Sequence, residues 1–335
     1  MEHRVFTSFE DARAAWEQLN DSYKGGELCL DWETHRLIWE DFYGPRGYDL
    51  AIHAGFRGQE CRWCVPLVRT VRDPYGAPSW SFSDEVLIGR EYLCRPEELE
   101  EMARAVPPHL SDDLSCFHGP PGAPGGWETL PGSVVDLRED TETYLATLSR
   151  SSRKDLRQAL RRNADLEVLA GTVFPSAAVE ALLPGHLATW ARRAGGEETP
   201  YFDYCRQKTR CDLRVLRRAA ELGRLVSLEL RLGGMPVAVN LAVRREGDRV
   251  DDYLCVRDGR PELLPRGLGL FAILANMETC RGLGIRWYDL SAGITSYKAR
   301  FLNAALTYRR PVYPGAELRD WEPAPGMHPT TMERS

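Results

Sequence analysis

Lysine is scarce in this chain of 335 residues. Only four of its 43 basic residues are lysines, Lys24, Lys154, Lys208 and Lys298, and the rest are arginines. Arginine is a rigid, always-charged fork, whereas lysine is a compact point charge on a flexible stem. Lys298 follows a turn-like Gly-Ile-Thr-Ser segment, from which a lone ammonium can reach one oxygen atom of a bound substrate. A surface lysine fits the same spacing.

Long apolar runs are also missing. No stretch approaches the roughly 18 apolar residues that are needed to cross a bilayer. The first residues, Met-Glu-His-Arg-Val-Phe, lack the basic region and apolar stretch of a signal peptide. We therefore expect no membrane span and a cytoplasmic location.

An excess of basic charge is absent as well, because the formal net charge is -6. A protein that coats nucleic acid normally carries a basic excess, so this class is disfavoured. A local basic patch can still contact the end of a nucleic acid. The apolar content of 43% is typical of globular proteins, and the length is enough for two domains.

The nine cysteines are odd in number and scattered in spacing. Cys61 and Cys64 form a CxxC pair, but no second pair follows at the spacing of a zinc site. The pair also lies in a strand-like run, where residues three apart face opposite sides. The pattern predicts free, mostly buried thiols, no metal site and no tightly bound cofactor.

The predicted elements alternate between helices and strands, and the apolar spacing changes along the chain. In the first part we expect mainly helix over residues 7–45, a hairpin of 50–54 with 61–68, a helix over 96–106 and a strand over 134–137. In the second part we expect helical spacing from Thr141, a helix over 177–194 interrupted near Pro184, and another over 212–222. Strands over 225–232, 236–243 and 250–256 follow, then a helix over 266–282 and a strand over 285–290.

Basic residues line one side of the helical segment that follows Thr141. They recur at three- and four-residue steps: Arg150, Arg153, Lys154, Arg157 and Arg161. A solvated helix face explains this pattern. A face that contacts phosphate explains it equally well, because phosphate favours arginine donors.

The order of short motifs in the second half resembles the GNAT N-acyltransferase superfamily, and in particular its Fem-like branch. The matching segments are Ser151–Arg162, His186–Trp190, Gly234–Leu241, Arg266–Gly269, Gly284–Leu290 and Tyr297–Phe301. Together they span about residues 140–305. The N-terminal third is similar to that family in layout only.

This resemblance implies an α+β fold with two tandem GNAT-like domains. Each would have a mostly antiparallel central sheet flanked by helices. The implied division is a degenerate N-terminal domain over residues 1–140, a catalytic domain over 141–312 and a proline-rich tail over 313–335.

The resemblance also implies that an amine attacks an activated carbonyl, and that a preorganised donor stabilises the charge on the carbonyl oxygen. In Fem-like enzymes a lysine in the matching segment lies near the reaction centre, which points to Lys298. Tyr297 is its neighbour, expected to orient it or donate a proton. Asp289, at the end of a predicted strand, is the candidate base or orienting group. A role as a helix cap or as an arginine partner suits Asp289 equally.

Two acyl donors remain open. Acyl-CoA enzymes of this superfamily hold a pyrophosphate on amides at a helix start, with the pattern [Arg/Gln]-x-x-Gly-x-[Gly/Ala]. Here Arg266 and Gly269 match the pattern, but its final position is Phe271, a bulky residue where close approach is needed. Arg266, Gly267, Gly269 and Phe271 are the candidate donor-binding residues. We therefore favour aminoacyl-tRNA as co-substrate, with acyl-CoA as the alternative. The basic face would then contact the tRNA acceptor end or a phosphorylated acceptor.

The expected function is amide bond formation on an amine of a small molecule or peptide, of a natural-product or cell-envelope type. A catalytically inactive binding module with the same fold is the rival hypothesis, and Phe271 is the residue that favours it. An RNA-binding scaffold is weaker because the net charge is negative.

Overall fold

The fold is described from a computed structural model of the chain. It describes residues 1–22, 28, 31–69, 80–82, 93–94, 96–106, 109–110, 127–245, 247–292, 297–304 and 306–311. The proline-rich tail over 313–335 lies outside these residues. So does the Gly-Ile-Thr-Ser segment before Tyr297.

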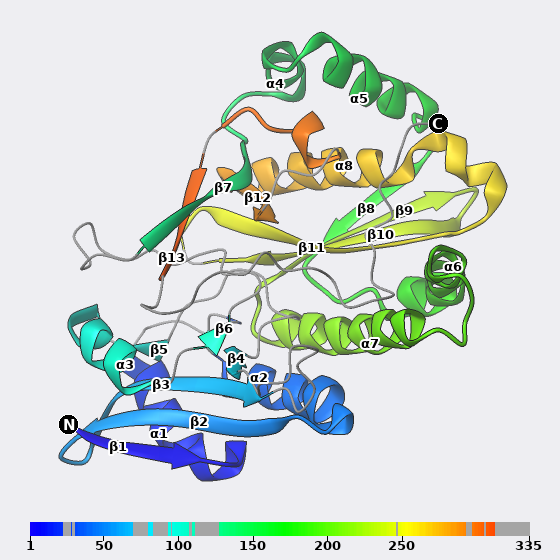
Figure 1. The fold of residues 1–335 in the computed structure, drawn as a ribbon. Helices are drawn as coiled ribbons and strands as arrows, with labels where there is room; N and C mark the ends of the chain where they lie inside the picture. The colour runs from blue at the N-terminus through cyan, green and yellow to red at the C-terminus, as the bar shows by residue number, and fades with distance from the viewer. Residues whose placement is uncertain are drawn as a thin grey trace.

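The first half of the chain forms a six-stranded sheet with three α-helices among its described residues (Figure 1). The helices are α1 (Phe9–Ser22), α2 (Trp32–Ile38), which continues as a π-helix (Trp39–Tyr43), and α3 (Leu99–Ala105). The strands are β1 (Glu2–Phe6), β2 (Asp49–Arg57), β3 (Glu60–Arg69), β4 (Trp80–Phe82), β5 (Leu93–Cys94) and β6 (His109–Leu110). The strand order is β1-β2-β3-β4-β6, with β5 also paired to β3. All pairs are antiparallel except β4 with β6.

The second half forms a seven-stranded sheet in the order β13-β7-β12-β11-β10-β9-β8. Its strands are β7 (Trp127–Asp136), β8 (Glu167–Gly171), β9 (Leu225–Leu232), β10 (Met235–Arg244), β11 (Arg249–Arg257), β12 (Trp287–Ala292) and β13 (Leu306–Pro311). Its helices are α4 (Thr141–Thr147), α5 (Arg150–Arg162), α6 (Ser176–Ala194), α7 (Pro200–Glu221) and α8 (Leu268–Gly282). Only the pair β11–β12 is parallel.

The helices cover the two faces of the second sheet in separate layers. Figure 1 shows α4, α5 and α8 on one side, and α6 and α7 on the other side, toward the first half. Leu156, Met277 and Tyr288 belong to the core on the α8 side. The core on the α6 and α7 side also includes α1, α2 and β2, so the two halves share one apolar cluster. Removing this apolar surface from water is the main force that holds them together.

Three helices differ from the sequence prediction. Helix α6 runs without a break through Pro184, because a proline removes only one backbone hydrogen bond and the helix is held by packing on both sides of it. Helix α7 starts at Pro200, well before residue 212, with Thr199 as its N-cap. The helical spacing after Thr141 is split in two, because Ser149 accepts a hydrogen bond from the Ser152 amide and starts a new helix.

The parallel pair β11–β12 is short, and this positions the candidate site. Only Arg249, Val250 and Asp251 of β11 pair with β12, opposite Trp287, Tyr288 and Asp289. Among the described residues the two strands form no pair beyond that point. The two strands therefore diverge after Asp251, and Asp252 is the first residue of β11 beyond the last pair.

A β-bulge lies at the same place. Leu241 of β10 pairs with Leu254, whereas the next residue, Ala242, pairs with Asp252. Tyr253 is thus the extra residue of β11, and it packs in the core toward α7. Consecutive strand residues face opposite sides, so Asp252 and Tyr253 point to opposite faces of the sheet. The bulge instead places Tyr253 and Leu254 on the same face, against the core shared with α7.

The α+β class with a largely antiparallel sheet in each half is confirmed. The division at residue 140 stays a prediction. The strand Trp127–Asp136 lies before that boundary, and it pairs with β12 and β13 in the second sheet. No described helix is long and apolar enough to cross a membrane.

Candidate functional site

Lys298 begins a short 3₁₀ turn (Lys298–Arg300) that packs against α5. Its residue surface is only 8% exposed, which is unusual for a lysine. The turn is held by the Tyr144 hydroxyl, which donates a hydrogen bond of 2.6 Å to the Phe301 carbonyl. An ion pair of 3.7 Å between Arg300 and Asp155 adds a second tie. The turn that carries Lys298 is therefore held in place from both α4 and α5.

A buried polar network lies next to this turn, between β10, β11, β12 and α8. The Tyr288 hydroxyl donates to the Asp252 carboxylate at 2.7 Å, and the Asn240 amide donates to the same oxygen at 3.0 Å. Asn276 of α8 donates to the Asn240 carbonyl oxygen and, at 3.2 Å, to the Tyr288 hydroxyl. Burying polar groups costs free energy unless they are paired. A paired polar cluster in the core therefore indicates a functional role in addition to packing.

The Asp252 carboxyl is electrically coupled to Lys298. Burial raises the pKa of Asp252, while the hydrogen bonds from Tyr288 and Asn240 and the nearby Lys298 ammonium oppose that rise. Tyr297 lies close to the same carboxylate. Burial of its hydroxyl end, together with the Asp252 charge, raises the pKa of Tyr297 to about 12, although the residue as a whole is 44% exposed. Its phenol is therefore protonated at neutral pH and is a proton donor.

Asp289 is fully buried and forms an ion pair with Arg249. Arg249 also contacts Asp251 at 3.2 Å, and Arg245 lies 3.7 Å from the same carboxylate. Tyr288 points toward α8, so Asp289, the next residue of the strand, points to the opposite face. The structure thus places Asp289 beside the site but on the other side of the sheet from the Asp252 network.

The residues predicted to bind the donor lie at the start of α8. Gly267 is the N-cap of this helix with φ of 68°, a left-handed conformation that glycine adopts without strain. No side chain caps the helix start. Arg266 is turned away, because its guanidinium forms a bidentate ion pair with Asp165 at 2.7 and 2.9 Å. The Phe271 side chain is 8% exposed and lies in the core with Leu228 and Leu263. It does not cover the helix start.

Arg257, at the end of β11, is a residue that the sequence reasoning missed. A Cβ atom added at Gly269 would lie 2.9 Å from its Nη1 atom, so the guanidinium rests against the first turn of α8. Among the described residues no carboxylate forms an ion pair with Arg257. A cation at the positive end of a helix dipole is unfavourable unless an anion binds both.

His186 of α6 lies near the same guanidinium. Its Nε2 atom accepts a hydrogen bond of 3.1 Å from the Trp190 indole. Burial, together with the charges of Arg257 and Arg193, lowers the pKa of His186 to about 4. The imidazole is neutral at pH 7, so Arg257 supplies the positive charge at this end of β11.

The predicted basic face lies along α5, which packs on α8. Arg150, Lys154 and Arg161 are exposed, and none has a partner in the described part of the chain. Arg157 pairs with Glu142 at 2.6 Å, and Arg153 donates to the Leu148 carbonyl at 3.1 Å. Three of the five cations are therefore available to an external anion.

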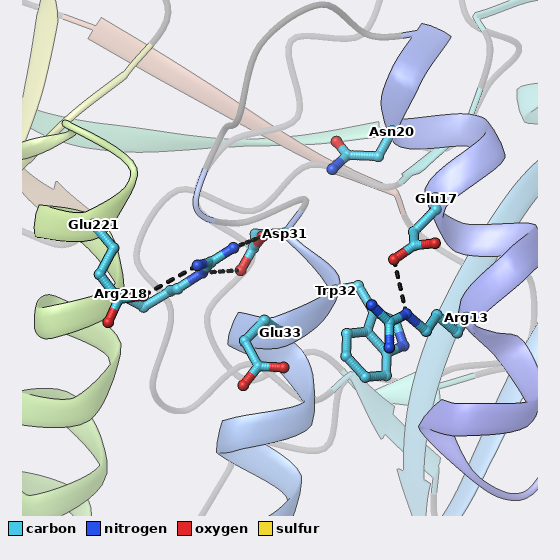
Figure 2. Close-up of a pocket in the computed structure, with 8 residues that line it drawn as sticks. All are labelled: Arg13, Glu17, Asn20, Asp31, Trp32, Glu33, Arg218 and Glu221. Atoms are coloured by element: carbon cyan, nitrogen blue, oxygen red, sulfur yellow. Dashed lines mark hydrogen bonds and ion pairs between the residues drawn. The ribbon is translucent and has the colours of Figure 1, made fainter.

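A pocket of about 360 Å³ lies elsewhere, between α1, α2 and α7 (Figure 2). Its lining residues are Arg13, Glu17, Asn20, Asp31, Trp32, Glu33, Arg218 and Glu221. Most of its charges already pair with one another: Arg218 with Asp31 at 3.0 Å, and Arg13 with Glu17 at 2.8 Å. None of the predicted site residues lies here. We interpret this pocket as a polar joint between the two halves.

We expect Asp31→Ala to lower the free energy of unfolding by about 1–3 kcal/mol, because Asp31 caps α2 through the Thr34 amide and also pairs with Arg218 across the joint. Chemical denaturation measures the change. Asp140→Ala is the matched control, since Asp140 caps α4 in the same manner without an arginine partner across the halves. An equal loss of unfolding free energy in the two variants would show that the ion pair between Asp31 and Arg218 does not stabilise the chain.

The described residues contain no group of three or more His, Cys, Asp or Glu side chains that could hold a metal ion. Seven cysteines among them are free thiols, and most are buried. Cys61 and Cys64 both lie in β3 and are fully buried.

Comparison with known proteins identifies the second half of the chain. Residues 150–299 match the family model described as an acetyltransferase (GNAT) domain. This part of the chain is similar to GNAT domains. The matched part contains α5 to α8, β8 to β12 and Lys298, and the matching family is one of acyltransferases. No curated protein matches the sequence at a significant level.

Several solved structures are similar to the whole chain. One is a conserved protein of unknown function from Bacteroides thetaiotaomicron VPI-5482, with 12% identity, 91% of this chain and 98% of that chain covered, and a TM-score of 0.51. FemX is similar at 10% identity, 92% and 95% coverage and a TM-score of 0.48. A tandem GNAT protein from the clavulanic acid biosynthesis pathway is similar at 16% identity, 93% and 97% coverage and a TM-score of 0.42. The match of residues 150–299 to the GNAT domain model confirms the predicted resemblance to the GNAT superfamily.

Proposed function

We propose that this chain is an N-acyltransferase that joins an activated acyl group to an amine of a small molecule or peptide. One observation carries the proposal. The buried Lys298 stands in the part that matches a GNAT domain, near the half-buried Asp252 carboxylate, at the point where β11 and β12 diverge. A buried ammonium next to a coupled carboxylate and a protonated phenol provides the groups that acyl transfer requires.

In this proposal each group has one role. The amine attacks the acyl carbon, and the Lys298 ammonium stabilises the negative charge that develops on the carbonyl oxygen. Tyr297 donates its proton to the leaving sulfur or oxygen atom. The Asp252 network holds Lys298 in place. Asp289 has an orienting role, because its carboxylate is engaged by Arg249.

The start of α8 favours acyl-CoA as the donor. The sequence argument against this donor was the bulk of Phe271, and that side chain lies in the core. An uncapped helix start beside the unpaired guanidinium of Arg257 is suited to phosphate, because backbone amides and arginine both donate to its oxygens.

Aminoacyl-tRNA is the second candidate donor, and a different observation supports it. Arg150, Lys154 and Arg161 form an exposed row of unpaired cations on α5. A few such cations are enough to contact the phosphates of a tRNA acceptor end.

Ribonuclease distinguishes the two donors. The purified chain is incubated with an amine acceptor and either acyl-CoAs or charged tRNAs, with and without ribonuclease, and the amide product is measured. We expect transfer from acyl-CoA that ribonuclease does not affect. Transfer from charged tRNA alone, abolished by ribonuclease, would contradict the donor assignment. An absence of amide product with every donor would contradict the function.

We expect Arg257→Ala to raise the KM for acyl-CoA about tenfold while kcat changes little, because a phosphate far from the reacting carbon is bound equally in the ground and transition states. Initial-rate kinetics measures both constants. Arg260→Ala is the control, since Arg260 is 55% exposed and pairs with Asp258 instead. An unchanged KM in Arg257→Ala would refute a phosphate site at the start of α8.

A further inference from the structure

The face of α7 that packs on the second sheet carries polar side chains. Tyr201, Cys205, Lys208 and Asp212 follow one another at steps of four, three and four residues, which places them along one side of the helix. Farther along, Val215, Leu216 and Ala219 are apolar and fully buried. Asp212 is only 4% exposed. A carboxylate in such a position is costly and calls for a reason.

Two groups hold the Asp212 carboxylate. The Lys208 ammonium donates to both of its oxygens, at 3.1 and 2.9 Å. The Tyr253 hydroxyl, which comes from β11, forms the other hydrogen bond. Asp212 and Lys208 belong to α7, whereas Tyr253 belongs to β11. The Asp212 carboxylate therefore connects α7 to the bulge of β11.

Asp212, Lys208 and Tyr253 adjoin the Lys298 site through strand β11. Tyr253 is the extra residue of β11 and points toward α7, whereas its neighbour Asp252 points toward α8 and is coupled to Lys298. The two consecutive residues therefore serve opposite faces of the sheet at the place where β11 and β12 stop pairing. Tyr253 is thus one residue along β11 from Asp252, the carboxylate that lies near Lys298.

We propose that Tyr253 and Asp212 form the proton-accepting relay for the acceptor, which binds on the α7 side as a primary ammonium. This inference rests on the proposed acyl transfer. The Tyr253 hydroxyl takes one proton from the ammonium as it passes its own proton to Asp212. The freed lone pair forms the C–N bond. The bond from carbon to the leaving sulfur or oxygen breaks as Tyr297 protonates that atom. A second proton from the nitrogen restores Tyr297, and Asp212 releases its proton to water.

The surroundings of Asp212 agree with this role. Burial raises the pKa of Asp212, while Lys208 and Tyr253 lower it. The Cys211 thiol is its neighbour on the helix, and its own pKa is raised chiefly by burial and further by the Asp212 charge. A carboxyl whose pKa moves upward is better matched to the proton of an ammonium than an ordinary one is.

The test compares two kinds of acceptor in Asp212→Asn. With a primary alkylamine, which is protonated at neutral pH, we expect kcat/KM to fall about 100-fold and the dependence on Asp212 ionisation to disappear from the pH profile. With hydroxylamine, which is a free base at neutral pH and needs no deprotonation, the variant should react nearly as fast as the native chain. Tyr253→Phe should show the same selective loss, so the test does not depend on one variant folding.

Asp203→Asn is the matched control on the same helix, because Asp203 is exposed and pairs with Arg206. It should keep the native pH profile with both acceptors. An equal loss with alkylamine and hydroxylamine in Asp212→Asn and Tyr253→Phe, or a native profile in both, would overturn the relay. If the native chain transfers no acyl group to either acceptor, the proposed function itself fails, and the inference fails with it.

Discussion

Replacing Lys298 by alanine is expected to lower kcat/KM at least 100-fold without unfolding the chain. One preorganised donor at a developing oxyanion contributes about 3–4 kcal/mol in well-studied enzymes, which corresponds to 100- to 1,000-fold in rate. Lys298 is buried at the divergence of β11 and β12. Most of the loss should appear in kcat, because the charge forms only in the transition state.

Steady-state kinetics with circular dichroism measures both parts of this expectation. Arg300→Ala is the matched control, since Arg300 lies in the same 3₁₀ turn but is 41% exposed and contacts only Asp155 at 3.7 Å. It should retain nearly native turnover. A Lys298→Ala chain that is folded and as active as the native one would remove Lys298 from the reaction centre.

Replacing Arg249 by alanine is expected to destabilise the chain by about 3–5 kcal/mol, because breaking a buried ion pair leaves an uncompensated charge. Asp289 and Asp251 are 0% and 1% exposed, and Arg249 contacts both of them. After the substitution only Arg245 would remain near Asp251. Such a loss is a large share of the stability of a typical domain.

Urea denaturation followed by fluorescence measures this change in the free energy of unfolding. Arg138→Ala is the control, because Arg138 pairs with Asp136 but its side chain is 66% exposed, and exposed ion pairs contribute little. The double variant Arg249→Ala with Asp289→Asn should recover part of the loss. A single variant as stable as the control would mean that Asp289 is not held by Arg249.

Helices and strands were predictable where the apolar period was unbroken. The strands at 225–232, 236–243 and 250–256 follow from alternation and from a glycine turn, and they appear as β9, β10 and β11. The start of α7 was missed because the predicted helix relied on its apolar half, although Thr199 and Pro200 are a recognisable helix start. Polar side chains point inward from the first half of α7, so this half lacks the apolar periodicity on which the prediction relied.

The candidate site was predictable in part. The position of Lys298 followed from its rarity and from the motif order. The partners of that lysine did not, because Asn240, Asp252 and Asn276 are far apart in the sequence and meet only when β10, β11 and α8 pack together. A signal did exist, since each is a polar residue inside an otherwise apolar strand or helix.

Local spacing also could not tell which way a side chain points. Phe271 occupies the last position of the phosphate motif, yet it lies in the core because the inward stripe of α8 includes Leu268, Phe271 and Ala272. The bulge at Tyr253 likewise breaks the alternation along β11, so that Tyr253 and Leu254 pack on the same face. The direction of these side chains depends on the register of the strands, which the sequence alone does not give.

The most direct test of acyl transfer is a search for its product. The purified chain is incubated with a pool of acyl-CoAs and aminoacyl-tRNAs and a pool of amines, and mass spectrometry then looks for amides. We predict at least one amide that forms with the native chain, consumes its donor and is lost with Lys298→Ala. Intact donors and no amide with the folded native chain would contradict acyl transfer and would favour a binding module that retains only the fold.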